Sequence, residues 1–332
     1  MMPLVCLWRT RGILQPEHQS DTHKKDGLSR SVGAWAQAYA CLGPYPRYME
    51  IRPIQFDEGS LRNYEALFAA CFPPSEKFGV QALRWLYTQN PAGQAVGFDA
   101  WEGEALAAHY VCVPALISHE GQSRRMLLSL NTATHPRFQG RGLFTKLAQT
   151  TYESAASLGF DAIHGVANAN STPGFIKKLG FQLVQPLEAR IGLGSLRVDR
   201  ERLSDGAQFQ RIWQLDHLRW RCANPVNPIR ARSQNGCSQF LAPAKGHLLP
   251  VYAQLEEPGL ADAAASRQAV ASPARLFLGL YPKDACRYER YVEIPRKLRP
   301  SPLNFIFLPL QTHVAPLKTG AVQFSFLDFD AY

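Results

Sequence analysis

One stretch of the sequence has the residue types that bind a phosphorylated anion. A predicted strand, Arg125 to Thr134, leads into a turn with two glycines, Gly140 and Gly142, and an apolar helical pattern starts directly afterwards. The first amides of a helix have no partner within the helix and lie at the positive end of its dipole, so this junction suits a pyrophosphate. Glycine lets the backbone approach the anion without a Cβ in between. Arg137 and Arg141 can add positive charge from the side.

A second motif runs from Asn168 to Phe181 and ends in Lys-Leu-Gly-Phe. Gly180 is typical of the residue that follows the C-terminus of a helix. Asn170 or Ser171 can cap the start of the same helix. The motif therefore predicts a strand, a short helix and a further strand.

Together the two motifs resemble those of the GNAT acyltransferase superfamily, over about Met49 to Leu187. The acyl-CoA signature of that family is Gln/Arg-x-x-Gly-x-Gly/Ala after a His-Pro-like pair. Gln139 and Gly142 match it, whereas Phe144 stands where the family has a small residue. A register that starts at Arg137 matches formally but fits the preceding strand less well.

The resemblance implies acetyl-CoA or another short acyl-CoA as co-substrate, and no metal. The residues that it assigns to cofactor binding are Thr132, Ala133, Thr134, Arg137, Gln139, Gly140, Arg141, Gly142, Leu143, Phe144 and Asn170.

The implied reaction is direct attack of an amine on the acyl thioester. A backbone N–H near Ala133 is expected to polarise the thioester carbonyl. A base must first deprotonate the amine, and His164 and His109, on two predicted strands, are the candidates, with an ordinary structural role as the alternative for each. Many family members place an acidic tyrosine where this chain has Ile176, which cannot protonate a leaving thiolate.

Trp85 and Tyr87 are candidates for the wall of the acceptor site, although their helical spacing also fits a plain core position. The serines and cysteines show no triad-like partners, which argues against a covalent intermediate.

Composition limits the other function classes. The 332-residue chain has a formal charge of +9, which favours a small polyanionic ligand. It has no block of five or more Lys/Arg, and its aromatic residues are not interleaved with basic ones. We therefore do not expect nucleic-acid binding. Seven unpatterned cysteines and no long apolar run favour a cytoplasmic protein without disulfides, metal site or membrane span.

The pattern after Met49 predicts an α+β protein of the GNAT fold, a mixed, mostly antiparallel sheet flanked by helices, in the order β-α-α-β-β-β-α-β-α-β. Residues 1–48 are expected to be disordered or an over-extended translation start. Leu83-Arg84-Trp85 before Asn90-Pro91 recurs as Leu218-Arg219-Trp220 before Asn224-Pro225. We therefore expect a catalytic domain at 49–189 and a second GNAT-like domain without a phosphate loop at 190–332.

This tandem layout resembles bacterial acyltransferases that modify amino sugars on nucleotide carriers, as does the stretch Arg299 to Asn304. The acceptor is accordingly expected to be a small amine, foremost a nucleotide-linked amino sugar, and the chain a monomer or small homo-oligomer. The alternatives are a GNAT enzyme for a peptide, lysine or xenobiotic amine, and a non-catalytic acyl-CoA-binding protein.

Overall fold

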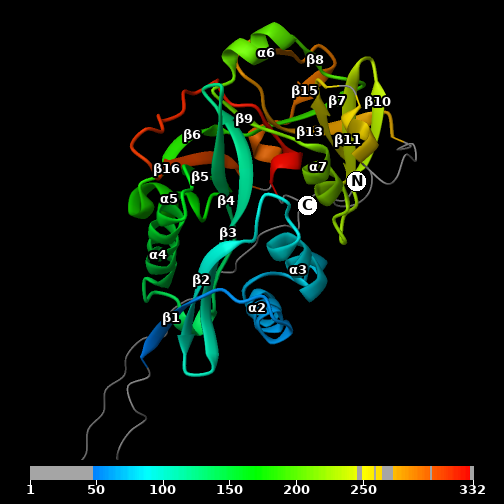
Figure 1. Cartoon of the computed structure of the whole chain (residues 1–332). Coiled ribbons are helices and arrows are strands. Elements are labelled where there is room, and N and C mark those ends of the chain that lie inside the picture. Colours follow the sequence, from blue (N-terminus) through cyan, green and yellow to red (C-terminus); the bar gives the residue numbers. More distant parts are fainter. Residues whose placement is uncertain (1–47, 245–248, 258, 264–271, 300, 330–332) are drawn as a thin grey trace, which may run out of the picture.

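The computed structural model describes residues 48–244, 249–257, 259–263, 272–299 and 301–329. The segment expected to be disordered, 1–48, lies outside these residues except for Tyr48. The fold has the expected α+β character, with two large sheets and helices packed against them (Figure 1). Among the described residues, no helix is both long and apolar enough to cross a membrane.

The first sheet, sheet A, carries the predicted elements in the predicted order. Its strands, in spatial order, are β1 (Met49–Pro53), β2 (Val96–Glu102), β3 (Ala105–His119), β4 (Gln122–Thr134), β5 (Ala162–Ala167), β16 (Asn304–Pro309) and β6 (Gln182–Pro186), and β9 (Phe209–Arg211) pairs with β3. Helices α2 (Glu58–Cys71) and α3 (Val80–Thr88) lie on one face, and α4 (Leu143–Ser157) and α5 (Thr172–Leu179) on the other (Figure 1).

Local chemistry explains the helix ends. Asp57 caps α2, because its carboxylate accepts the Ser60 amide at 3.0 Å. The apolar side of α2 is buried at Leu61, Tyr64, Leu67 and Phe68, which is the spacing of one helix face.

The second sheet, sheet B, is built mainly from the second half of the chain. Its strands, in spatial order, are β10 (Arg230–Gln234), β11 (Cys237–Pro243), β12 (Pro250–Leu255), β13 (Ala274–Leu280), β7 (Glu188–Leu193) and β15 (Tyr291–Glu293), and β17 (Phe324–Ser325) pairs with β13. The helices α6 (Arg200–Gly206) and α7 (Leu215–Cys222) and a two-stranded sheet of β8 (Arg197–Val198) and β14 (Cys286–Arg287) complete this half.

The two sheets share one order of strand directions. Each has antiparallel strands that lead to a parallel pair, β4 with β5 in sheet A and β12 with β13 in sheet B, followed by two antiparallel strands. The strand next to the parallel pair is exchanged between the halves. β16, from the second half, lies between β5 and β6, while β7, directly after β6, lies between β13 and β15.

The exchange affects the expected boundary at 189/190. That boundary falls inside β7, and the chain beyond it returns to sheet A as β16. Hydrogen bonding between strands far apart in sequence decides this arrangement, and local patterns do not report it.

The repeated Leu-Arg-Trp elements meet in space. Trp85 on α3 and Trp220 on α7 stack with ring centroids 4.9 Å apart. Each indole N–H donates to the backbone carbonyl of the other tryptophan, at 3.1 and 3.2 Å. The Asn-Pro elements correspond as well, since the side-chain oxygens of Asn90 and Asn224 each accept an amide two residues ahead. The two halves thus repeat a sequence element, a strand order and a contact geometry.

This reciprocal pair predicts a coupled loss of stability. In Trp85→Phe the Trp220 carbonyl loses the indole donor and keeps the Ala223 amide, so the free energy of unfolding should fall by about 0.5–1.5 kcal/mol. Trp220→Phe should behave in the same way. A double-mutant cycle by denaturant unfolding should give a coupling of about 0.5–3 kcal/mol. Trp101→Phe, on half-buried β2, is the control and should cost less than either; additive losses at Trp85 and Trp220 would contradict the geometry.

Candidate active site

The predicted anion loop is open towards solvent and ends at an uncapped helix. Gly140 and Gly142 have φ angles of 79° and 72°, the left-handed region that favours glycine. Nothing lies within 4 Å of a Cβ built at either position. Gly142 is the N-cap of α4, and within the described part of the chain no side chain caps that first turn. The amides at the start of α4 are therefore available to an anion, which fits the pyrophosphate of an acyl-CoA.

Cationic and polar side chains surround this loop. The guanidinium carbons of Arg141 and Arg137 lie 5.1 and 5.8 Å from the ring centroid of Phe138. Arg141 also donates to Glu102 at 2.8 Å, which holds it beside the turn. The Gln139 amide donates to the Thr134 carbonyl at 3.3 Å and joins the loop to the end of β4. The structure thus brings the predicted residues from 134 to 144 together.

Phe144, the departure from the family signature, is accommodated by a glycine. A Cβ at Gly174 on α5 would stand 3.1 Å from the Phe144 ring. That ring meets Phe175 edge-on, with centroids 5.3 Å apart. Gly174 on α5, which has no side chain, therefore leaves the space that the Phe144 ring occupies, and the start of α4 keeps its helical geometry.

The strand beside the loop separates from its parallel neighbour. β4 pairs with β5 from Met126 to Ser129 only. Immediately beyond, Asn131 has a φ of 45°, and the register with β3 shifts there. Asparagine tolerates this left-handed conformation better than most residues. The result is a wedge between β4 and β5 that opens at the bulge.

The register between β3 and β4 indicates which amides near Ala133 face the wedge. His135 donates its amide to Ala107 at 2.9 Å, and Ala133 is the register partner of His109 on the same strand pair. Antiparallel pairs alternate, so Ala133 also directs its amide towards β3. The amides of Thr132 and Thr134 point to the opposite side, into the wedge, because successive residues alternate. These two amides are better placed than that of Ala133 to meet a thioester.

Ser171, one of the two residues expected to cap α5, is its N-cap, and the Asn168 side chain orders the turn before it. The Asn168 side-chain oxygen accepts the amides of Asn170 and Ser171, at 3.0 and 2.9 Å. Asn170 itself is exposed. Ile176 is half-buried against the core under α4 and α5 and has no proton to donate.

His164 lies in an aromatic core. Its ring is 5.1 Å from Phe209 and 6.1 Å from Phe305, centroid to centroid. Burial first, and then the Arg211 guanidinium, lower the pKa of His164 to about 3. A histidine with so low a pKa does not take a proton from an amine near neutral pH, so the structural role is favoured.

His109 belongs to a buried hydrogen-bonded network. Its Nδ1 lies 2.6 Å from Asp99 Oδ1, and its Nε2 lies 3.1 Å from the Tyr87 hydroxyl. Tyr64 donates to the other Asp99 oxygen at 2.7 Å. Burial first, and then the Asp99 charge, raise the pKa of Tyr64, so Tyr64 stays protonated. Asp99 and Tyr64 were not predicted, because a single Asp in a strand and a Tyr on a helix give no spacing signal.

The two aromatic residues expected at the acceptor wall are both buried. Trp85 is in the stack with Trp220, and Tyr87 is in the His109 network. They lie on the α2–α3 side of sheet A, against the second half of the chain. Neither forms an open wall in this structure.

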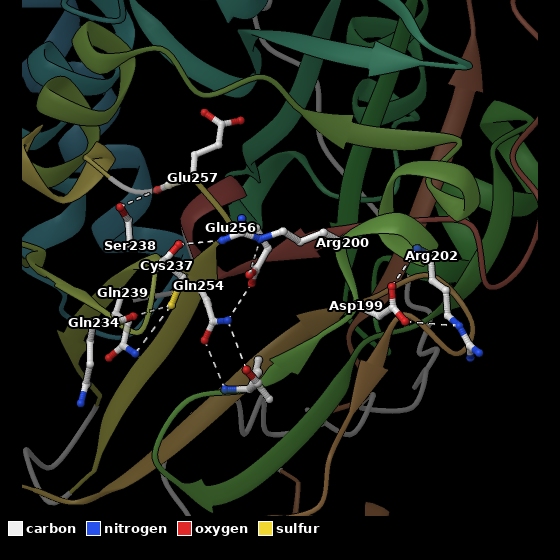
Figure 2. Close-up of polar contacts among 12 residues, drawn as sticks. Asp199, Arg200, Arg202, Gln234, Cys237, Ser238, Gln239, Gln254, Glu256 and Glu257 are labelled. Atoms are coloured by element: carbon white, nitrogen blue, oxygen red, sulfur yellow. Dashed lines mark hydrogen bonds and ion pairs between the residues drawn. The ribbon is translucent and has the colours of Figure 1, made fainter.

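A separate polar cluster on the sheet B side is internally bonded. Figure 2 shows Gln254 between Glu256 and the backbone of Leu196, and Arg200 beside Glu256. Asp199 caps α6 by accepting the Arg202 amide at 3.1 Å. These contacts fix α6 against sheet B. Within the described residues, no group of three or more His, Cys, Asp or Glu could hold a metal ion.

Comparisons with known proteins agree with this geometry. Residues 50–184 match the family model described as an acetyltransferase (GNAT) domain. No curated protein matches the chain significantly.

Among solved structures, the GCN5-related N-acetyltransferase from Kribbella flavida is 12% identical, with a TM-score of 0.52 over 78% of this chain and 71% of that one. A GCN5-related N-acetyltransferase from Anabaena variabilis is 10% identical, with a TM-score of 0.49 over 79% and 73%. The Escherichia coli GNAT family N-acetyltransferase YhbS, solved with CoA, is 20% identical, with a TM-score of 0.33 over 42% and 72%. The likeness to the Kribbella flavida structure shows the fold.

The loop predicts the effect of one substitution. Gly142→Glu places a carboxylate at the anion site, so calorimetric titration with CoA should show no binding. Gly159→Glu is the matched control, because Gly159 has a φ of 77° with open space around its Cβ, at the other end of α4. Both variants carry the same backbone cost of about 1–2 kcal/mol. Wild-type CoA affinity in Gly142→Glu, or an equal loss in Gly159→Glu, would refute the assignment.

Proposed function

We propose that this chain, whose residues 50–184 form an acetyltransferase domain of the GNAT family, transfers a short acyl group from acyl-CoA to a primary amine. One observation carries the proposal. The uncapped start of α4 and its two left-handed glycines lie directly after β4, at the point where β4 and β5 have separated. With its pyrophosphate at the start of α4, the remainder of the acyl-CoA lies along the wedge, and its acyl end reaches the bulge.

The residues on the page support direct transfer. The amides of Thr132 and Thr134 face the wedge and can stabilise the negative charge that develops on the thioester oxygen. The amine nitrogen attacks the thioester carbon after losing a proton. Its second proton then passes to the departing sulfur, so CoA leaves as the thiol and Ile176 is not required as an acid. The described residues form no covalent-catalysis triad around the wedge.

Sheet B has the corresponding wedge, but the chain itself fills it. β12 and β13 pair in parallel at Val251 and Tyr252 only. β17 then pairs with β13 at Gly279 and Leu280, beside the point where β12 leaves. Arg221 on α7 holds this segment, donating to the carbonyls of Leu327 and Phe329 at 2.9 and 2.8 Å. The sequence of this half also lacks a glycine-rich strand-to-helix junction. We therefore propose one acyl-CoA site per chain.

The second half is proposed to shape the acceptor groove. Its α7 contacts α3 through the Trp85–Trp220 pair, on the face of sheet A where the bulge opens towards α2 and α3. Ligand sites favour such interfaces between structural units. A half that binds no acyl-CoA would then be retained for the acceptor.

For the acceptor we put a nucleotide-linked amino sugar first. The positive formal charge of +9 favours polyanions, and the tandem layout resembles enzymes of that class. The stretch Arg299 to Asn304 adds no direct support, because Ser301 accepts the Ala169 amide at 3.1 Å and Asn304 donates to Thr172 at 3.0 Å. These contacts hold the α5 loop and leave sugar recognition to other residues. A peptide, lysine or xenobiotic amine would use the same acyl-CoA loop.

Two measurements test this function. Equilibrium titration with CoA should give one site per chain. A mass-spectrometric screen of acetyl-CoA and short hydroxyacyl-CoA against amine classes should show mass gain on nucleotide-linked amino sugars first. Two equivalent CoA sites would contradict the filled wedge; a mass gain confined to peptides or drug-like amines would overturn the sugar assignment alone. CoA binding with no acylated amine would identify a non-catalytic protein.

A deletion after Arg190 is a poor substitute for that screen. It would remove β16 from the centre of sheet A together with the second half. Loss of activity would then report a broken sheet rather than a lost acceptor groove.

A further inference from the structure

We propose that the buried series Asp99–His109–Tyr87 removes the proton from the acceptor amine, with the Tyr87 hydroxyl as the group that the amine contacts. This inference rests on the proposed acyl transfer and names the base of that same site. It gives Tyr87 a role in proton transfer in place of the expected role in the acceptor wall. Asp99 and His109 act through Tyr87 and are positioning residues.

With a neutral His109, the hydrogen bonds have a single direction of donation. Asp99 accepts from His109 Nδ1 at 2.6 Å, which leaves His109 Nε2 without a hydrogen and able to accept from Tyr87 at 3.1 Å. The Tyr87 oxygen in turn accepts from the Asn131 amide at 3.1 Å. Every donor therefore points towards the carboxylate, which is the direction in which a proton must travel.

The series ends at the reaction point expected for the acyl group. His109 is the register partner of Ala133, between the two threonines whose amides face the wedge. Asn131 forms the left-handed bulge of β4 and is half-buried. The side-chain amide of Asn131 donates to the Tyr87 oxygen, so an N–H donor can approach that oxygen from the side of the bulge. Backbone strain held at such a position is typical of functional sites.

Burial strengthens the electrostatic interaction between the Asp99 carboxylate and His109. Asp99 is only 2% exposed and His109 is fully buried, so a charge on either is little screened by water. The Asp99 carboxylate accepts from His109 Nδ1 and so fixes the orientation of the ring. The other titratable groups packed here are Tyr64 on α2, which donates to Asp99, and Tyr87 on α3. Phe68 covers the remaining side of the His109 ring.

The proton balance is complete without another reactant. The ammonium form of the acceptor gives one proton to the Tyr87 oxygen as the Tyr87 hydroxyl proton moves to His109 Nε2. His109 is then an imidazolium paired with Asp99. The free amine attacks, the C–N bond forms, the C–S bond breaks, and the second amine proton goes to sulfur. His109 returns its proton through Tyr87 to solvent.

Two tyrosines bond to this network, and they separate a catalytic role from a structural one. Tyr64 and Tyr87 are both fully buried, and each donates a hydroxyl to one member of the Asp99–His109 pair. Only Tyr87 lies between that pair and the bulge. Tyr87→Phe and Tyr64→Phe are therefore matched variants of similar packing cost.

The experiment measures acyl transfer by the full chain, with acetyl-CoA and the best amine from the screen, across pH 5–9. Tyr87→Phe should lower kcat about 100-fold or more at an unchanged KM for acetyl-CoA, the usual range for general acid–base catalysis. Tyr64→Phe should retain kcat within about tenfold. His109→Gln removes the group that accepts the Tyr87 hydroxyl proton, so it should lower kcat by a factor similar to that in Tyr87→Phe, at an unchanged KM for acetyl-CoA. CoA affinity and melting temperature are measured for each variant to confirm folding.

Each outcome decides the inference. Equal loss in Tyr64→Phe and Tyr87→Phe, or a wild-type kcat in His109→Gln, overturns the relay while leaving acyl transfer intact. A wild-type chain that binds CoA but acylates no amine overturns the proposed function and the relay with it. A loss of kcat in Tyr87→Phe and His109→Gln that Tyr64→Phe does not share supports the relay.

Discussion

The exchange of β7 and β16 constrains every other part of this molecule. β16 pairs with β5 along its whole length and with β6 on its other side, and Phe305, Ile306 and Phe307 at its centre are almost completely buried. β7 has the same position in sheet B, between β13 and β15. Neither sheet has a continuous core without a strand from the other half, so the two halves are one cooperative unit although each has its own sheet.

The exchange also positions the acyl-CoA wedge. β5 forms one side of the wedge, and β16 pairs with the edge of β5 that faces away from β4. The residues just before β16 hold the loop into α5, through Ser301 to Ala169 and Asn304 to Thr172. The second half thus holds both β5 and the loop into α5 in the first half. In sheet B, β17 pairs with β13 at the corresponding position.

Local sequence carried the phosphate loop, the α5 motif and the Leu-Arg-Trp repeat, because glycine placement, helix ends and apolar spacing depend on neighbouring residues. The strand exchange was not predictable in this way, since β5 and β16 pair across most of the second half. The sequence placed a backbone N–H near Ala133 but could not indicate which amide faces the wedge, because the bulge at Asn131 affects this and a bulge has no clear sequence signal. Asp99 was missed for a similar reason. A buried carboxylate becomes visible only when its partners from α2, α3 and β3 are assembled around it.

The exchanged strands also determine when the protein can fold during synthesis. When β6 has left the ribosome, sheet A still lacks the strand between β5 and β6, and both present unpaired edges. The missing strand is translated only after nearly all of sheet B, so sheet A cannot close until late. Such long-range pairing slows folding and lengthens the exposure of open edges to other chains. This chain should therefore depend on chaperones during expression more than a GNAT domain whose sheet is complete within one contiguous segment.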